Sequence, residues 1–108
     1  MKNKVFLIGR VVKDPTIETT ENGNKRVYST LAVPRSYKNS DGEYDTDFIS
    51  CVLWKGVAEN TVEYCRKGSL VGIKGHIQSR DIDEDKKQAI EVVAEKVTFL
   101  SSRKVETE

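Results

Sequence analysis

The chain of 108 residues contains little cysteine, histidine or proline: two, one and two residues, respectively. Two cysteines are too few for a disulfide framework, and Cys51 and Cys65 do not form a Cys-x-x-Cys motif. Together with a single histidine, this leaves no ligand set for a zinc site. We therefore expect neither a metal nor a cofactor in this protein.

Long apolar runs are also absent. No stretch approaches the ~20 consecutive apolar residues that span a bilayer. The N-terminal segment has a basic start but only four apolar residues in a row, at positions 5–8, whereas a secretory signal needs roughly 7 to 15. We therefore expect no signal peptide, no membrane partner and a cytoplasmic location.

The chain also has no large excess of positive or negative charge. The 18 lysines and arginines nearly balance the 17 aspartates and glutamates, which gives a net charge of +1. This balance argues against a protein that holds DNA through bulk charge alone, but it leaves room for a local basic groove. With 37% hydrophobic residues, the chain can form one compact core. We expect one domain over residues 1–100 and a short flexible C-terminal tail over residues 101–108.

Strand signal, in contrast, is plentiful. The β-rich runs are residues 5–12, 26–33, 48–54, 70–80 and 88–100. Residues 16–20 look like a continuation of the first run. They lead to Asn22-Gly23, which predicts a hairpin turn before the second strand.

One helix and two loops complete the predicted secondary structure. Residues 57–67 form the only convincing helix, and Gly68 stands where a C-cap is expected. Residues 35–47 are predicted as a long polar loop, and residues 81–87 as a charged loop.

Glycines inside the predicted strands, at positions 9, 72 and 75, mark bulges or sharp bends of the kind that a closed barrel needs. The order of the elements is strand, strand, strand, helix, strand, strand. It is compatible with an all-β, five-stranded Greek-key barrel with one helix between strands 3 and 4, the OB-fold. The ligand face of that fold is centred on strands 2 and 3.

The third strand separates two kinds of side chain, because side chains alternate across a strand. One face is compact and aliphatic, as a barrel interior should be: Ile49, Cys51 and Leu53. The other carries two large rings with a serine between them: Phe48, Ser50, Val52 and Trp54. This second face predicts a platform on which unpaired bases stack. The alternative is that both faces are core, or that the aromatics pack against a partner subunit.

Other rings also require an assignment. Tyr37 lies between Arg35 and Lys38, and one ring with two cations suits contact with a base and a phosphate; a solvated loop fits the same residues equally well. Tyr28 shares the parity of Thr30 and could lie on the ligand face, although a single bulge reverses that parity.

The fourth strand alternates polar with smaller or apolar side chains. Its polar set predicts a groove wall: Lys74, His76, Gln78 and Arg80. No Ser, Cys or carboxylate partner is specified for His76 by the sequence. A surface or interface role is therefore favoured over a catalytic one for this histidine.

Four carboxylates lie close together: Asp41, Glu43, Asp45 and Asp47. They lack the spacing and the glycine position of an EF-hand loop. Two-metal nucleases also use carboxylates, so a small nuclease is one alternative. A solvated acidic loop is the favoured interpretation.

Several segments resemble the bacterial-type single-stranded DNA-binding protein family, in order and at matching spacing. They are NKVFLIGR (residues 3–10), KDP (13–15), NG (22–23), TLAV (30–33), DFISCVLW (47–54), AE (58–59), KGSLV (67–71) and EVVA (91–94). Such a series is far more specific than any single motif. The resemblance implies an OB-fold that usually assembles as a homotetramer and binds single-stranded DNA without sequence preference.

The resemblance also implies the site. Tyr37 matches the family's aromatic after strand 2, Phe48 the one that opens strand 3, and Trp54 the one that closes it. Arg80 matches a basic position at the end of strand 4, and Ile82 stands where the family has a further aromatic. With nearby cations, the candidate DNA-binding residues are Tyr37, Phe48, Trp54, Arg35, Lys38, Lys55, Lys74 and Arg80. We expect no catalytic residue.

The leading hypothesis is a non-enzymatic, nucleoid-associated protein that coats and protects single-stranded DNA in replication, recombination and repair. An alternative is an OB-fold assembly module of a primosome-like complex, whose aromatic face is a protein interface. The family usually continues into an acidic tip that recruits replication proteins. This chain ends Val105-Glu106-Thr107-Glu108, so recruitment through such a tail is not expected.

Overall fold

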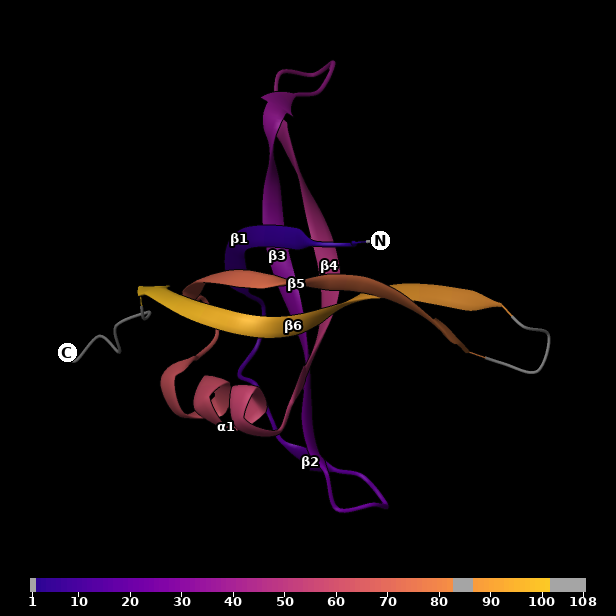
Figure 1. Cartoon of the computed structure of the whole chain (residues 1–108). Helices are drawn as coiled ribbons and strands as arrows, with labels where there is room; N and C mark the ends of the chain where they lie inside the picture. Colours follow the sequence, from indigo (N-terminus) through magenta and orange to yellow (C-terminus); the bar gives the residue numbers. More distant parts are fainter. Residues whose placement is uncertain (1, 83–86, 102–108) are drawn as a thin grey trace.

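The computed structural model of the chain describes residues 2–82 and 87–101. Its elements are β1 (Val5–Val11), β2 (Glu18–Thr19), β3 (Lys25–Lys38), β4 (Tyr44–Trp54), α1 (Lys55–Tyr64), β5 (Leu70–Asp81) and β6 (Gln88–Ser101) (Figure 1). As predicted, a helix lies between the third and fourth of the long strands. Within the described residues, no helix has the length and apolar character needed to cross a membrane.

Five strands close into a barrel. They are hydrogen-bonded in the order β1, β5, β6, β4, β3, and β3 returns to β1 where Val11 pairs with Leu31. The pairing of β4 with β6 is parallel and the other pairings are antiparallel. The short strand β2 pairs with β3 alone and lies outside the ring. This arrangement confirms the predicted all-β barrel of the OB-fold type.

Two of the predicted bend glycines lie where strands approach closely. A methyl group added to Gly9 would overlap the backbone oxygen of Ala32, and one added to Gly75 would overlap that of Val93. Gly75 also marks the place where the register between β5 and β6 shifts. Residues without a Cβ are therefore required where the backbone of another strand approaches this closely.

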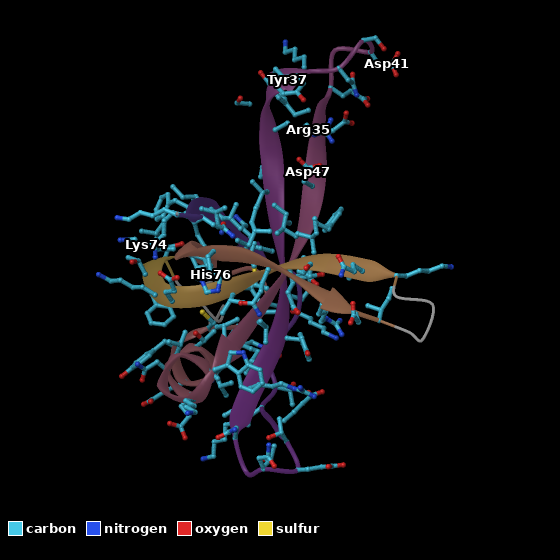
Figure 2. All side chains as sticks on the ribbon, turned by 45° about the vertical axis from the view of Figure 1, so that its right-hand side comes forward. Arg35, Tyr37, Asp41, Asp47, Lys74 and His76 are labelled. Carbon is cyan, nitrogen blue, oxygen red and sulfur yellow. The ribbon has the colours of Figure 1, made fainter. Side chains whose placement is uncertain are left out.

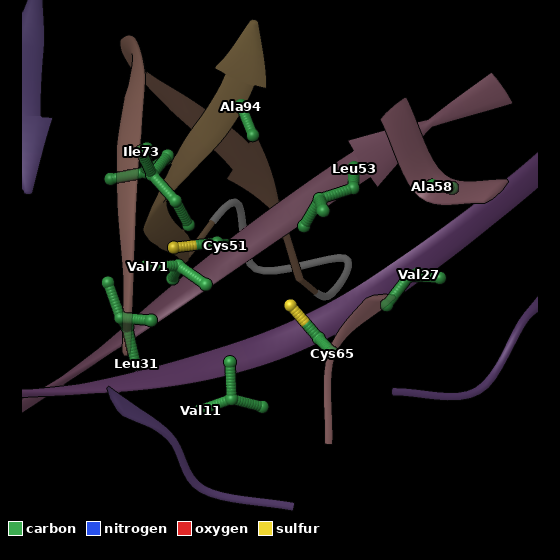
Figure 3. Close-up of a cluster of buried hydrophobic side chains, with 11 residues drawn as sticks. Val11, Val27, Leu31, Cys51, Leu53, Ala58, Cys65, Val71, Ile73 and Ala94 are labelled. Atoms are coloured by element: carbon green, nitrogen blue, oxygen red, sulfur yellow. The ribbon is translucent and has the colours of Figure 1, made fainter. Parts of the chain in front are cut away.

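The core lies inside the barrel and receives side chains from all five barrel strands and from α1. It consists of Val11, Val27, Leu31, Cys51, Leu53, Ala58, Cys65, Val71, Ile73, Val92 and Ala94 (Figure 3). Both cysteines are buried free thiols, and burial raises the pKa of the Cys51 thiol to about 11. This thiol is protonated at neutral pH and acts as a small apolar packing group.

The prediction of a loop over residues 35–47 is wrong. β3 continues to Lys38 and β4 begins at Tyr44, so only residues 39–43 connect them. The two strands leave the barrel and project as a long hairpin (Figure 1). Pro34 does not end β3, because β1 no longer pairs with β3 at that point and an N–H group is not needed there. A strand that projects into solvent needs no apolar face, so its amino-acid composition resembles that of a polar loop.

Two smaller predictions also fail. Residues 16–20 do not continue the first strand, because β1 ends at Val11 and the separate strand β2 forms the hairpin with β3 around Gly23. Gly68 is not the C-cap of α1, which ends at Tyr64. Instead Gly68 has a φ of 90° in the following turn, where its N–H donates to the backbone oxygen of Val11 at 2.7 Å.

Two further predictions concern residues 81–87 and 101–108, which the structure describes only in part. The predicted tail, apart from residue 101, lies outside the described residues. So do the acidic positions 83–85 of the predicted charged loop. Ile82 and residue 87 at the two sides of that loop are described, and the N–H of Ile82 donates to the backbone oxygen of Lys87 at 2.9 Å.

Candidate nucleic-acid interface

The outer face of β3 and β4 carries a strip of paired side chains. The antiparallel register pairs, in order along the strip, Arg26 with Trp54, Tyr28 with Val52, Thr30 with Ser50 and Ala32 with Phe48. Directly opposed residues of an antiparallel pair point to the same side of the sheet. The strip, defined by these eight residues, therefore collects both predicted rings of β4 on one surface.

Burial separates the two faces of β4. Cys51 and Leu53 are each 1% exposed, whereas Phe48 is 67% exposed. Val52 departs from the simple pattern, because it lies on the outer face and is still only 3% exposed. The predicted alternation therefore holds for the buried Cys51 and Leu53 and the exposed Phe48, but not for Val52. The strip has an open ring at the Phe48 end and a half-buried ring at Trp54.

The two ends of the strip differ in their surroundings. Phe48 lies opposite Ala32, whose methyl group is too small to cover a ring. Trp54 has the guanidinium carbon of Arg26 at 5.8 Å from its ring centre. At a rise of ~3.3 Å per residue, the two rings are ~20 Å apart along β4. An open ring at one end and a ring with a cation beside it at the other are features of surfaces on which single-stranded nucleic acids stack.

Tyr37 lies near the far end of the projecting β3–β4 hairpin and is 63% exposed (Figure 2). The ammonium group of its neighbour Lys38 lies 5.9 Å from the ring centre of Tyr44. The turn is closed by the side-chain oxygen of Asn39, which accepts two backbone N–H groups at 2.8 and 3.0 Å. Tyr37 and Lys38 are thus presented by a paired hairpin and not by an irregular loop.

Arg35 is engaged within the same hairpin. Its guanidinium donates to both carboxylate oxygens of Asp47, at 2.9 and 3.0 Å, and lies 3.9 Å from Asp45. The hydrogen bond with Asp47 raises the pKa of Arg35, and the same bond holds the pKa of Asp47 below its usual value. A phosphate at Arg35 has to compete with this carboxylate.

The acidic residues of the hairpin also make contacts within it. Asp45 accepts a hydrogen bond from the side-chain amide of Asn39 at 3.2 Å, and Asp47 holds Arg35. Over residues 2–82 and 87–101, no group of three or more His, Cys, Asp and Glu side chains is placed to hold a metal ion. Two of the four carboxylates that suggested a nuclease, Asp45 and Asp47, thus make contacts within the hairpin.

Arg80 and Lys55 lie beside the strip. The Nε of Arg80 donates to the carboxylate of Glu91 at 3.0 Å, and its guanidinium carbon is 5.7 Å from the ring centre of Tyr28. Lys55 follows Trp54 directly and is exposed. Its φ of 53° is in the left-handed region, which costs a non-glycine residue ~1–2 kcal/mol and is typical of functional sites.

Lys74 lies away from the strip. Its register partners are Phe6 of β1 and Lys96 of β6, so it faces outward from the wall formed by β1, β5 and β6. Figure 2 shows it near His76 and well away from Tyr37. The structure therefore does not bring Lys74 together with the other candidates.

His76 belongs to an ion cluster on that same wall. Its Nδ1 lies 2.7 Å from the carboxylate of Glu95. The same carboxylate also accepts a hydrogen bond from the ammonium group of Lys4 at 2.8 Å. The hydrogen bond to Glu95 raises the pKa of His76. The pKa of Glu95 is lowered most by the hydrogen bond from Lys4 and next by the one from His76. These contacts agree with the predicted surface role of the histidine.

The strip also contains residues that were not among the candidates. Arg26 is not among the predicted site residues, and the parity of Tyr28 leaves its face open because a single bulge reverses it. The guanidinium carbon of Arg26 is 4.9 Å from the ring centre of Tyr28. Their positions beside Trp54 depend on the β3–β4 register, which the bulge after Pro34 sets. Composition and spacing carry no signal for that register.

Comparison with known proteins finds relatives over nearly the whole chain. The model of the single-strand binding protein family matches residues 2–100. The chain is 43% identical over 106 residues to single-stranded DNA-binding protein B of Bacillus subtilis, covering 95% of this chain and 94% of that protein. It is 44% identical over 106 residues to single-stranded DNA-binding protein 1 of Clostridium acetobutylicum, covering 94% of this chain and 96% of the relative.

Other relatives are longer. The chain is 44% identical to the single-stranded DNA-binding protein of Halalkalibacterium halodurans, covering 95% of this chain but 63% of that protein. The residues matched by the family model, 2–100, include the strip on β3 and β4. A family model over nearly the whole described fold, together with these identities, shows that the chain belongs to the single-strand binding protein family.

Proposed function

We propose that this protein binds single-stranded DNA without sequence preference and coats and protects it in replication, recombination and repair. Membership of the family and the names of its relatives support the choice of ligand. The observation that carries the binding mode is the Phe48 ring, which is 67% exposed on the strand face opposite the buried Cys51 and Leu53. An exposed ring contributes little to folding, but it offers a flat π-surface to a base.

In this proposal, bases stack on Tyr37, Phe48 and Trp54, and the exposed Lys38 and Lys55 meet the phosphates. Within the described parts of the chain, neither lysine forms an ion pair. Stacking tolerates any sequence because every base has a π-face. With a net charge of +1, we expect affinity to fall with salt, but less steeply than for a strongly basic protein.

The remaining candidate cations have smaller roles in the proposal. Arg35 and Arg80 are held by carboxylates at 2.9 and 3.0 Å, so a phosphate gains less at each of them than at an unpaired lysine. Lys74, on the outer wall of β1, β5 and β6, can meet only DNA that continues around the barrel. Binding of this kind breaks no covalent bond, and we propose a non-enzymatic, cytoplasmic, nucleoid-associated protein.

We also propose a homo-oligomer, with four chains as the expected number. Phe6 and Ile8 of β1 are 63% and 49% exposed, and both point outward from the barrel. Two apolar side chains on an outer strand are more favourable when a second copy covers them. Light scattering at micromolar concentration tests this, and a mass near the 12.2 kDa of one chain would contradict it.

The experiment that tests the ligand is a titration with poly(dT), followed by the fluorescence of Trp54, the only tryptophan. We expect quenching that saturates and that is reversed by salt, and we expect no cleavage of the DNA when magnesium is added. No quenching together with no retardation of the DNA in a gel would contradict the proposal. That outcome would favour the assembly module, whose aromatic face contacts a protein.

A further inference from the structure

A cleft of about 290 Å³ opens between the strip and the β5–β6 hairpin. Its walls include Tyr28, Thr30 and Ser50 from the strip, Arg80 and Ile90 from the hairpin, and Lys13 from the segment after β1. This volume lies near the lower end of the ~300–1,000 Å³ range of small-ligand sites. Of the residues that the proposed function uses, only Arg80 lines this cleft.

Tyr28 offers a ring to the cleft. It is 39% exposed, with guanidinium carbons at 4.9 Å (Arg26) and 5.7 Å (Arg80) from its ring centre. Each guanidinium is oriented by a carboxylate at 3.0 Å: Arg26 by Glu18, and Arg80 by Glu91. Aromatic rings and guanidinium planes are the two protein surfaces on which unpaired bases stack.

Tyr28 lies between Phe48 and Trp54 along the strip. Tyr28 is opposite Val52, which is two residues from Trp54 and four from Phe48. These separations correspond to ~7 Å and ~13 Å along the strand. Without Tyr28, a bound strand crosses ~20 Å between the two rings of β4 with no flat surface below it. With Tyr28, a base next to the one on Trp54 also has a ring to lie on.

The polar groups of the cleft suit the rest of a nucleotide. Lys13 is exposed and, among residues 2–82 and 87–101, forms no ion pair. The hydroxyl groups of Thr30 and Ser50 can exchange hydrogen bonds with a base edge. The one carboxylate, Glu91, is 10% exposed and paired with Arg80, which reduces its repulsion of a phosphate.

We propose that Tyr28 and this cleft form an additional nucleotide subsite of the strip. The base of one nucleotide of a single strand lies against the Tyr28 ring, and Lys13 contacts a phosphate next to it. This inference rests on the single-stranded DNA binding proposed above, and it adds a ring and a cation to the residues considered there.

The test compares Tyr28→Phe, which keeps the ring, with Tyr28→Leu, which keeps apolar bulk without a π-face. Tyr64→Leu is the matched control, since Tyr64 is 55% exposed on α1 and its ring lies 5.5 Å from that of Phe99. Affinity is measured by the anisotropy of a dye-labelled oligothymidylate, and folding by thermal unfolding. We expect Tyr28→Leu to weaken binding about 5- to 150-fold, as for the loss of one stacked base. Tyr28→Phe and Tyr64→Leu should bind like the wild type.

Two further measurements separate a contact from a structural role. Oligonucleotides with 5-iododeoxyuridine, irradiated on the wild-type protein, should cross-link to the peptide that contains Tyr28. Lys13→Gln should reduce the slope of log K against log salt by about 0.7, the value for one phosphate contact on a single strand. A purely structural tyrosine would give no cross-link, and an unchanged slope would overturn the Lys13 contact. The cross-link also decides the question if Tyr28→Leu does not fold.

The outcomes distinguish this inference from the proposed function. A wild-type protein that does not bind oligothymidylate overturns the proposed function itself. A wild-type protein that binds, with unimpaired Tyr28→Leu and no cross-link at Tyr28, overturns the subsite alone. Equal losses in Tyr28→Phe and Tyr28→Leu also overturn it, because the ring would then not be the group that matters.

Discussion

The two faces of β4 differ in burial and therefore in role. On the inner face, Cys51 and Leu53 are 1% exposed and belong to the core that all the barrel strands share. On the outer face, Phe48 is 67% exposed. Because the side-chain period of a strand is two, a register slip by one residue would bury the rings and expose the core. Stability and the proposed binding therefore depend on the same register of β3 and β4, but on different residues.

The largest expected effect is on the inner face. Leu53→Ala should lower the free energy of unfolding by ~2–5 kcal/mol, because it leaves a cavity in a closely packed core. Ser50→Ala, on the exposed outer face, should change it by less than about 0.5 kcal/mol. Chemical denaturation of the two variants checks this. Equal stability of the two would mean that the faces are not divided as described.

The next effect is on the outer face. Phe48→Ala and Trp54→Ala should each weaken single-stranded DNA binding by ~1–3 kcal/mol while the domain stays folded. The poly(dT) titration measures Phe48→Ala, and anisotropy of labelled DNA measures Trp54→Ala, which has lost the fluorophore. If Trp54→Ala leaves no folded population, this ring belongs to the core. Phe48 gives the cleaner result because its ring is the more exposed.

A smaller effect is expected at the far end of the β5–β6 hairpin. Ile82 is 51% exposed and has no flat ring, so Ile82→Ala should cost much less affinity than Trp54→Ala. Ile82→Trp should tighten binding by up to ~1–3 kcal/mol if the new ring can lie against a base. Both are measured at one salt concentration with folding confirmed. Comparable losses from the two alanine variants would extend the main contact surface to this hairpin.

The smallest effect concerns stability and pH on the outer wall. His76 has a raised pKa, so its contribution to stability is complete below its ordinary value of 6.5 and is lost as pH rises through the raised value. Glu95 has a lowered pKa, so its contribution is complete above 4.5 and is lost as pH falls through the lowered value. Between these limits, the His76–Glu95 contact and the Lys4–Glu95 contact are both charged.

The variant His76→Gln isolates this effect. The stability difference between wild type and variant should be larger near pH 5.5 than near pH 9, about one unit below the ordinary histidine value and well above it. Thermal unfolding at the two pH values measures it. The difference should be small because exposed ion pairs are screened by water. A difference that grows toward alkaline pH would contradict the assignment of Glu95 as the partner.

The predictions from sequence held where a local rule is sufficient. The alternation in residues 48–54 depends only on strand geometry, so the inner and outer sets were predictable before any tertiary contact was known. Five β-rich runs with interior glycines and one helix between the third and fourth were compatible with the barrel that the structure shows. The projecting hairpin was missed because polar residues that pair as strands in solvent have the composition of a loop.

The amino-acid sequence by itself thus determined the order of the long elements along the chain and the division of β4 into a face with Cys51 and Leu53 and a face with Phe48 and Trp54. Only the tertiary structure decided which cations lie beside those rings. Arg35 is held by Asp47 across the hairpin, Lys74 lies on another wall, and Arg80 reaches Tyr28. Each of these contacts joins residues from different strands. The contact of Arg35 with Asp47 depends on the register of the β3–β4 pair, and that of Arg80 with Tyr28 on the parallel pairing of β4 with β6, which brings the β5–β6 hairpin beside the strip.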